Sequence, residues 1–200
     1  MFVYAGNNPV TLIDHTGLRP LTAGESATVR SAITFAGRYD SGVDSGTIGR
    51  VRNLFLNGQI IADDIPQVAI HSDFPGFSEK ITIGIPVLQR IETLKNLLEK
   101  RKRQNGECDK LQDDLDIELI TLASALIHEG THANGFNRFG QTAADEAAAY
   151  TSEALTLSNA IRGNRDRGRV QRGLKSSLNN TFSDALGEEG LVLPRSLRPR

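Results

Sequence analysis

Apolar residues recur with helical spacing along much of the chain. A first predicted helix begins near Thr22, which can cap it, carries Val29, Ile33 and Phe35, and ends in a glycine-rich loop over 37–49. Apolar positions three and four residues apart predict four later helices, over 86–103, 114–134, 142–161 and 170–186. The helix over 114–134 has a continuous apolar stripe, formed by Leu115, Leu119, Leu122 and Leu126.

Short β-prone runs lie between the first of these helices and the others. They cover 51–56, 59–62, 67–71 and 80–85, and turn-forming residues separate them. Helices and short strands in this order predict one α+β domain, in which the helices pack on a small twisted sheet.

Composition narrows the class of protein. The 23 basic residues nearly balance the 24 acidic ones, which argues against a general nucleic-acid binder. The single cysteine, Cys108, excludes an internal disulfide. No apolar run approaches the roughly 20 residues that span a bilayer, so we expect no membrane span. The N-terminus lacks the basic start and apolar middle of a signal peptide, so we expect another route of export.

The segment HEGTH, from His128 to His132, carries the clearest chemistry of the chain. Because four residues separate the two histidines, both imidazoles leave one face of a helix and can hold one metal ion. Glu129 can reach a water molecule on that ion without binding the ion itself. Zinc in such a site lowers the pKa of its water to roughly 7, and the carboxylate accepts the proton.

The surrounding sequence, TLASALIHEGTHANGF, resembles the active-site helix of the zincin metallopeptidases. The resemblance implies Zn²⁺ as cofactor, hydrolysis of peptide bonds with Glu129 as general base and then proton donor, and a third protein ligand. It also implies an edge strand above the active-site helix that binds substrate backbone, for which the run 80–85 (KITIGI) is the candidate. The metzincin subclass is excluded, because Arg138 replaces its third histidine and no methionine follows Met1.

A second resemblance concerns the third ligand. The segment TAADEAAAYTSEA resembles the third-ligand helix of gluzincin-like and several short metallopeptidase families, which implies Glu146 as the third zinc ligand. Glu153 lies seven residues later, about 10 Å along the helix, so both cannot reach one ion and Glu153 has at most an indirect role. Tyr150 is a candidate to donate to the oxyanion or to hold a ligand carboxylate, with simple packing as the alternative. His71 is a candidate for an oxyanion or indirect role, with a structural role as the alternative.

The N-terminal segment YAGNNPVTLIDHTGL resembles the closing motif of the Rhs/YD-repeat proteins, with His15 where that family has proline. In the family the core severs its C-terminal toxin after the leucine of this motif, here Leu18. The resemblance implies that residues 1–19 are the end of an Rhs core and that 20–190 are a delivered toxin. It also implies delivery into a target cell by a type VI or related secretion apparatus, and a cognate immunity protein in the producing cell.

Two features of the C-terminal part have open interpretations. The Pro/Arg-rich end predicts a flexible tail over 191–200. The stretch 162–175 carries six basic residues against Asp166 and either docks an acidic surface or is a solvated face between helices.

The sequence therefore predicts a zinc-dependent endopeptidase toxin that acts on a protein of the target cell and binds no nucleic acid. One alternative is a nuclease toxin, since Rhs cargo often attacks nucleic acid; the neutral charge and the complete motif argue against it. The other is a non-enzymatic module in which His128 and His132 hold a structural metal, although structural zinc sites are usually rich in cysteine.

Overall fold

The computed structural model describes residues 19–72, 79–134 and 142–198. Within them the fold is α+β and mostly helical, which confirms the predicted fold class at this level. The end of the expected Rhs core, up to Leu18, and Gly135 and Arg138 after the motif lie outside the described residues. The helices in chain order are α1 (Ala23–Arg38), α2 (Ser45–Leu56), α3 (Ile85–Arg103), α4 (Asp109–Asn134), α5 (Ala143–Gly163), α6 (Gly168–Glu189) and the 3₁₀ helix η2 (Arg195–Leu197).

The described strands form one mixed sheet. Its order is β1-β2-β4-β3, from strands β1 (Arg19–Pro20), β2 (Ile60–Asp63), β4 (Lys80–Gly84) and β3 (Ala69–Ser72). The two central strands, β2 and β4, run parallel, and each outer strand pairs antiparallel with its neighbour. Ile60, Ala62, Ile81 and Ile83 are buried, so the middle of the sheet belongs to the core.

The predicted edge strand was wrong. The segment KITIGI forms β4 and the start of α3, and β4 pairs with β2 on one side and β3 on the other. Its alternation is typical of a strand, but four of the five residues of β4 are buried, as in an interior strand. The edge beside the motif helix α4 is instead β3.

The run 51–56 was predicted as a strand and forms the second half of helix α2. Asp44 caps this helix by accepting a hydrogen bond from the main-chain N–H of Gly46 at 2.9 Å. Ile48, Val51 and Leu54 are buried at intervals of three residues, which is helical spacing. In the sequence, the three consecutive apolar residues at 54–56 hide this helical spacing.

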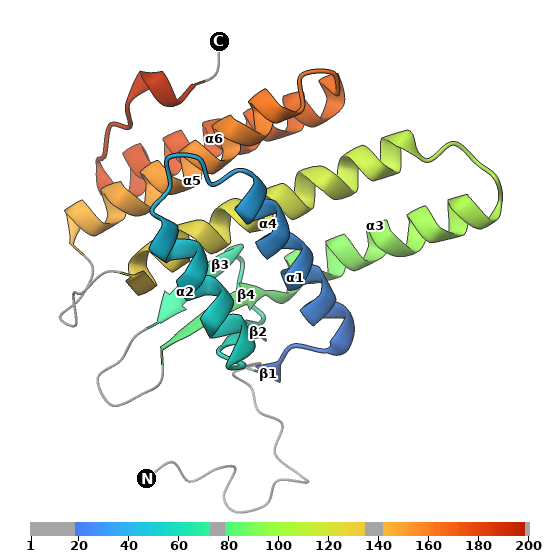
Figure 1. The fold of residues 1–200 in the computed structure, drawn as a ribbon, viewed down its shortest axis with the longest axis horizontal. Helices are drawn as coiled ribbons and strands as arrows, with labels where there is room; N and C mark the ends of the chain where they lie inside the picture. Colours follow the sequence, from blue (N-terminus) through green and yellow to red (C-terminus); the bar gives the residue numbers. More distant parts are fainter. Residues whose placement is uncertain (1–18, 73–78, 135–141, 199–200) are drawn as a thin grey trace, which may run out of the picture.

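Helix α4 runs through the middle of the molecule and joins two cores (Figure 1). On one side it packs with α1, α2, α3 and the sheet, where Leu119, Leu122 and Leu126 enter the first core. On the other side Ile120 enters a second core with α5 and α6. Because α4 is held on both sides, the motif at its C-terminal end has a rigid support.

The two ends of the described chain contribute to the fold. Arg19, placed by the sequence in the end of an Rhs core, pairs with Ala62 in the sheet. At the other end, within the expected flexible tail, Leu193 and Leu197 are buried in the second core. The guanidinium of Arg198 lies 4.4 Å from the ring centroid of Phe182. No helix in the described ranges is both long and apolar enough to cross a bilayer.

Candidate metal centre

The motif occupies the last turns of α4, where this helix packs closely on α2. A Cβ atom added to Gly130, the middle residue of HEGTH, would collide with the side chain of Val51 and crowd Thr47. Glycine therefore allows α2 to approach α4 at the level of the site. The opposite side of the same turns remains available for α5.

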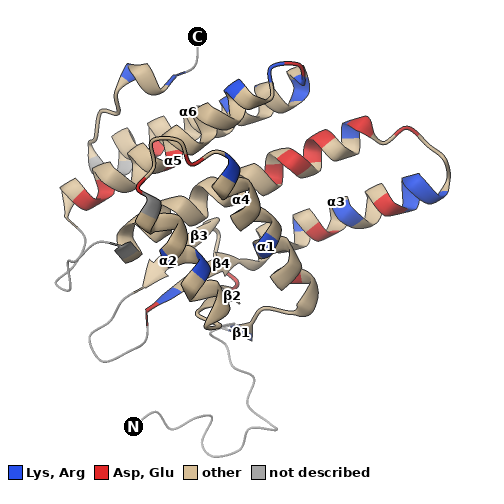
Figure 2. Cartoon of the chain, in the orientation of Figure 1, with Lys and Arg blue, Asp and Glu red and all other residues tan. Residues whose placement is uncertain are grey.

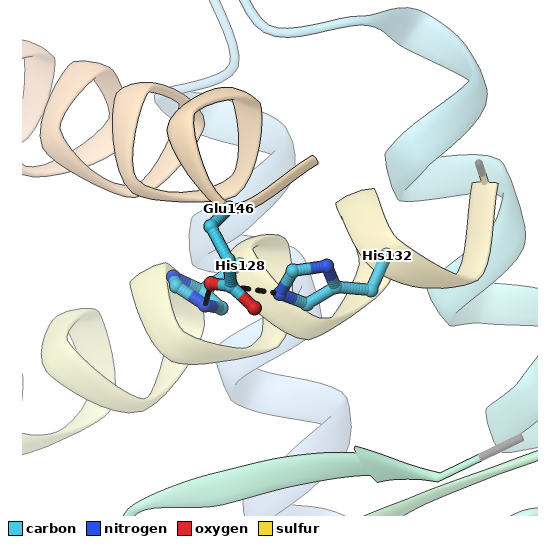
Figure 3. Close-up of side chains that lie close together, drawn as sticks. All are labelled: His128, His132 and Glu146. Carbon is cyan, nitrogen blue, oxygen red and sulfur yellow. Dashed lines mark ion pairs between the residues drawn. The ribbon is translucent and has the colours of Figure 1, made fainter. Parts of the chain in front are cut away.

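The start of α5 brings the third candidate to the two histidines. Thr142 and Asp145 form a capping box: the Asp145 N–H donates to the Thr142 hydroxyl oxygen, and the Thr142 N–H donates to the Asp145 carboxylate. This cap fixes the first turn of α5, which carries Glu146. Figure 3 shows the Glu146 side chain extending from α5 toward the imidazoles of His128 and His132 on α4.

The three side chains converge at their polar ends. Oε2 of Glu146 lies 3.7 Å from Nε2 of His128 and 3.5 Å from Nε2 of His132. One potential ligand atom from each residue lies within 4.8 Å of the other two, close enough for one metal ion (Figure 3). The structure thus brings together all three residues that the sequence proposed as ligands. Two imidazole nitrogens and one carboxylate oxygen are a donor set that suits zinc.

A second carboxylate of α5, that of Glu153, contacts the Nδ1 side of the His128 ring. Oε2 of Glu153 lies 3.1 Å from Nδ1 of His128, and Oε1 of Glu153 accepts a hydrogen bond from the Thr181 hydroxyl of α6. When Nδ1 carries the proton of a neutral His128, its Nε2 is left with a free electron pair facing Glu146 and His132. This is the usual support of a metal-binding histidine.

Burial and neighbouring charges shift the pKa values of the two imidazoles in opposite directions. Burial lowers the pKa of His132 to about 4, together with the nearby His128 and His71. His132 is therefore neutral at neutral pH, the form that binds metals. For His128, burial lowers the pKa, but the hydrogen bond with Glu153 and the adjacent carboxylates outweigh it and raise the pKa. Nδ1 of His132 is buried and has no hydrogen-bond partner among the described residues.

The side chain of Glu129 extends from α4 to the edge strand β3. Its Oε2 accepts a hydrogen bond from the main-chain N–H of His71 at 2.7 Å. Only 9% of the residue is exposed, and this burial raises the pKa of Glu129 to about 7, although His128 and the His71 N–H lower it. A carboxyl group with such a pKa can both accept and return a proton near neutral pH.

Tyr150 and His71, the two other candidates from the sequence, both lie beside the cluster. The Tyr150 ring packs edge-on against His128, with ring centroids 4.6 Å apart and an interplanar angle of 82°. The His71 ring stacks beside His132 with centroids 6.3 Å apart, and its Nε2 lies 3.1 Å from Oε1 of Glu79. Both residues thus lie against histidines of the cluster.

Two contacts that support residues of the site were not predicted from the sequence. Glu79 precedes β4 without any motif, and its contact with His71 follows only from the pairing of β3 with β4, which sets His71 opposite Ile81. The contact of Thr181 with Glu153 depends on how α6 packs on α5. The hairpin spacing of 67–71 and 80–85 is the only signal that could have indicated Glu79.

Part of the basic stretch 162–175 is paired within the protein. Arg167 binds Asp113 and Asp116, and Arg169 binds Asp114. In Figure 2, acidic residues colour the first turns of α4, and basic residues colour the turn between α5 and α6. These two arginines therefore connect helices within the fold.

Comparisons with protein-family models, curated proteins and solved structures found no match to this chain.

Proposed function

We propose that the protein is a zinc-dependent endopeptidase. The observation that carries this proposal is the convergence of His128, His132 and Glu146 on one point, with the buried carboxyl group of Glu129 on the adjacent residue of the same helix. A structural metal site needs the three ligands, but it has no use for a further buried carboxyl group on the residue next to one of them.

Each residue has a defined task in this proposal. His128, His132 and Glu146 hold the ion, and Glu153 orients His128. A zinc ion held by these residues would polarise the scissile carbonyl group and lower the pKa of a bound water molecule. Glu129 accepts a proton from the attacking water and then delivers it to the leaving amine nitrogen, so that the carboxylate is restored at the end of the cycle.

The substrate in this proposal is an extended segment of a protein. Strand β3 lies at the edge of the described sheet, beside the motif helix, and its residue His71 contacts Glu129 directly. An extended peptide that runs alongside this strand would pass next to Glu129. The role proposed from the sequence for the run 80–85 therefore belongs to β3.

The biological setting of the proposal comes from the Rhs-like N-terminal segment. It supports a toxin that is delivered by a type VI or related secretion apparatus, cleaves a protein of the target cell and is neutralised by an immunity protein in the producer. Both the metal site and the general base would then act inside the intoxicated cell.

The test compares Glu129→Gln with the wild type and with Glu99→Gln, a control at an exposed glutamate on α3. Zinc content is measured in the purified proteins, and toxicity is measured on expression in bacterial cells. We expect one equivalent of zinc in all three and loss of toxicity only in Glu129→Gln. New protein termini should appear in cells that express the wild type. Full toxicity of Glu129→Gln would contradict the mechanism, and fragments of nucleic acid without new protein termini would favour the nuclease alternative.

A further inference from the structure

His71 is the residue of the edge strand that contacts the motif through both its main chain and its ring. Its main-chain N–H donates to Glu129, and its ring stacks beside His132. In an antiparallel pair, residues alternately direct their N–H and C=O groups toward and away from the neighbouring strand. Because the His71 N–H reaches Glu129, it points away from β4, and the N–H groups of Ile70 and Ser72 point toward β4.

We propose that His71 is a positioning residue for the general base. Its main-chain N–H fixes Oε2 of Glu129 and leaves Oε1 as the oxygen that exchanges the proton. This inference rests on the proposed function for its catalytic meaning, but the hydrogen bond itself can be tested without activity.

The need for such a contact follows from the side chain of glutamate. Its carboxylate is separated from the helix by three rotatable bonds, and general-base catalysis requires the carboxylate within hydrogen-bond distance of the water. A loss of about 1 Å in placement can cost two orders of magnitude in rate. A charged acceptor bonded to an N–H of the sheet is held more firmly than one that depends on its own rotamer.

The position of His71 is in turn fixed from α2. Nε2 of His71 contacts Oε1 of Glu79, and Oε2 of Glu79 forms an ion pair with Arg50 of α2. The main-chain oxygen of Glu79 also accepts a hydrogen bond from the Gln59 amide at 2.7 Å. Helix α2 is also the helix that packs against Gly130 of the motif. Helix α2 therefore supports both partners of the hydrogen bond. It holds His71 through Glu79, and it packs on α4, which carries Glu129.

The first experiment measures amide hydrogen exchange by NMR in the wild type and in Glu129→Ala. We expect the His71 amide to exchange at least about tenfold faster in Glu129→Ala, because the hydrogen bond to a charged acceptor is lost. The amides of Ile70 and Ser72 serve as internal controls and should keep their rates. Equal exchange of the His71 amide in both proteins would overturn the proposal.

The second experiment separates the main chain of His71 from its ring. His71→Pro removes the N–H, at a position whose N–H does not bond to β4, whereas His71→Ala keeps the N–H and removes the imidazole. We expect His71→Pro to lose toxicity while binding zinc within about threefold of the wild type. His71→Ala should lose less toxicity, because it keeps the N–H donor and loses only the ring contact with Glu79. Equal toxicity of the two variants would contradict the proposal. If His71→Pro does not fold, the exchange rates decide.

The two proposals fail in different ways. If the exchange result is as expected but the wild type binds no zinc, the endopeptidase proposal fails and the contact between His71 and Glu129 stands. If zinc binds and Glu129→Gln is not toxic, but the exchange rate of the His71 amide is the same in Glu129→Ala as in the wild type, only the positioning role of His71 fails.

Discussion

Two glutamates of one helix meet the same imidazole from opposite sides. Glu146 faces Nε2 of His128 and Glu153 faces Nδ1, so the first is placed to share a metal ion and the second to orient a ligand. The spacing of the two residues on α5, two turns apart, makes both contacts possible at once.

Removal of each carboxylate should therefore have a different effect on zinc affinity. We expect Glu146→Ala to weaken zinc binding by at least about 100-fold, since a ligand is lost, and Glu153→Ala by about tenfold, since the orientation of His128 is lost. Competition with a chelating dye measures both. A larger loss in Glu153→Ala would show that the assignment of the two glutamates is reversed.

Packing of α2 on α4 depends on the absence of one side chain. Gly130→Ala places a methyl group against Val51, so we expect the free energy of unfolding to fall by about 1–3 kcal/mol. Gly49→Ala is the matched control, because it is also in a helix and nothing lies within 4 Å of its added Cβ. That variant should be neutral or more stable, because alanine favours helices. Urea denaturation that shows equal stability for both variants would contradict this account of the contact.

At the scale of elements, the start of α1 is held by an ion pair and a capping box that share one residue. Glu25 binds Arg19 of β1 at 2.6 Å and accepts a hydrogen bond from the Thr22 N–H at 2.8 Å. The hydrogen bond with Arg19 is the main cause that lowers the pKa of Glu25 to about 2. This junction connects the first strand of the sheet to the first helix.

The contribution of this junction to stability should depend on pH. A carboxyl group whose pKa falls on folding stabilises the native state above its ordinary pKa of 4.5, and this stabilisation disappears as pH falls toward about 2. Glu25→Gln should therefore be less stable than the wild type at pH 7, and the difference should shrink between pH 4.5 and 2. Thermal unfolding across this range measures it, and a difference that does not vary with pH would refute the ion pair.

Local signals in the sequence predicted most helices but not the order of the strands. Thr22 and Thr142 mark the starts of α1 and α5 because capping involves residues only three apart. The convergence of His128, His132 and Glu146 was predictable for a similar reason: two of them share a helix, and the third lies in the first turn of the next helix. The edge position of β3 and the contact of His71 with Glu129 depend on pairing between distant segments, which no local pattern contains.

At the scale of the whole molecule, the fold includes residues close to the junction that the Rhs resemblance implies. Arg19 and Pro20 form β1 and pair with β2, so the boundary expected after residue 19 falls inside a strand. We expect removal of residues 1–18 to leave the melting temperature nearly unchanged and removal of residues 1–20 to lower it, since the second truncation removes β1 and the ion pair with Glu25. Equal melting temperatures of the two truncated proteins would show that β1 does not stabilise the fold.

In the mechanism that we propose, Glu129 acts on water at a zinc ion held by His128, His132 and Glu146. The most direct test measures zinc content and cell killing together for the wild type and Glu129→Gln. Our account predicts one equivalent of zinc in both proteins and killing by the wild type alone, because glutamine can fill the same space but cannot accept the proton. Undiminished killing by a zinc-loaded Glu129→Gln protein would contradict it.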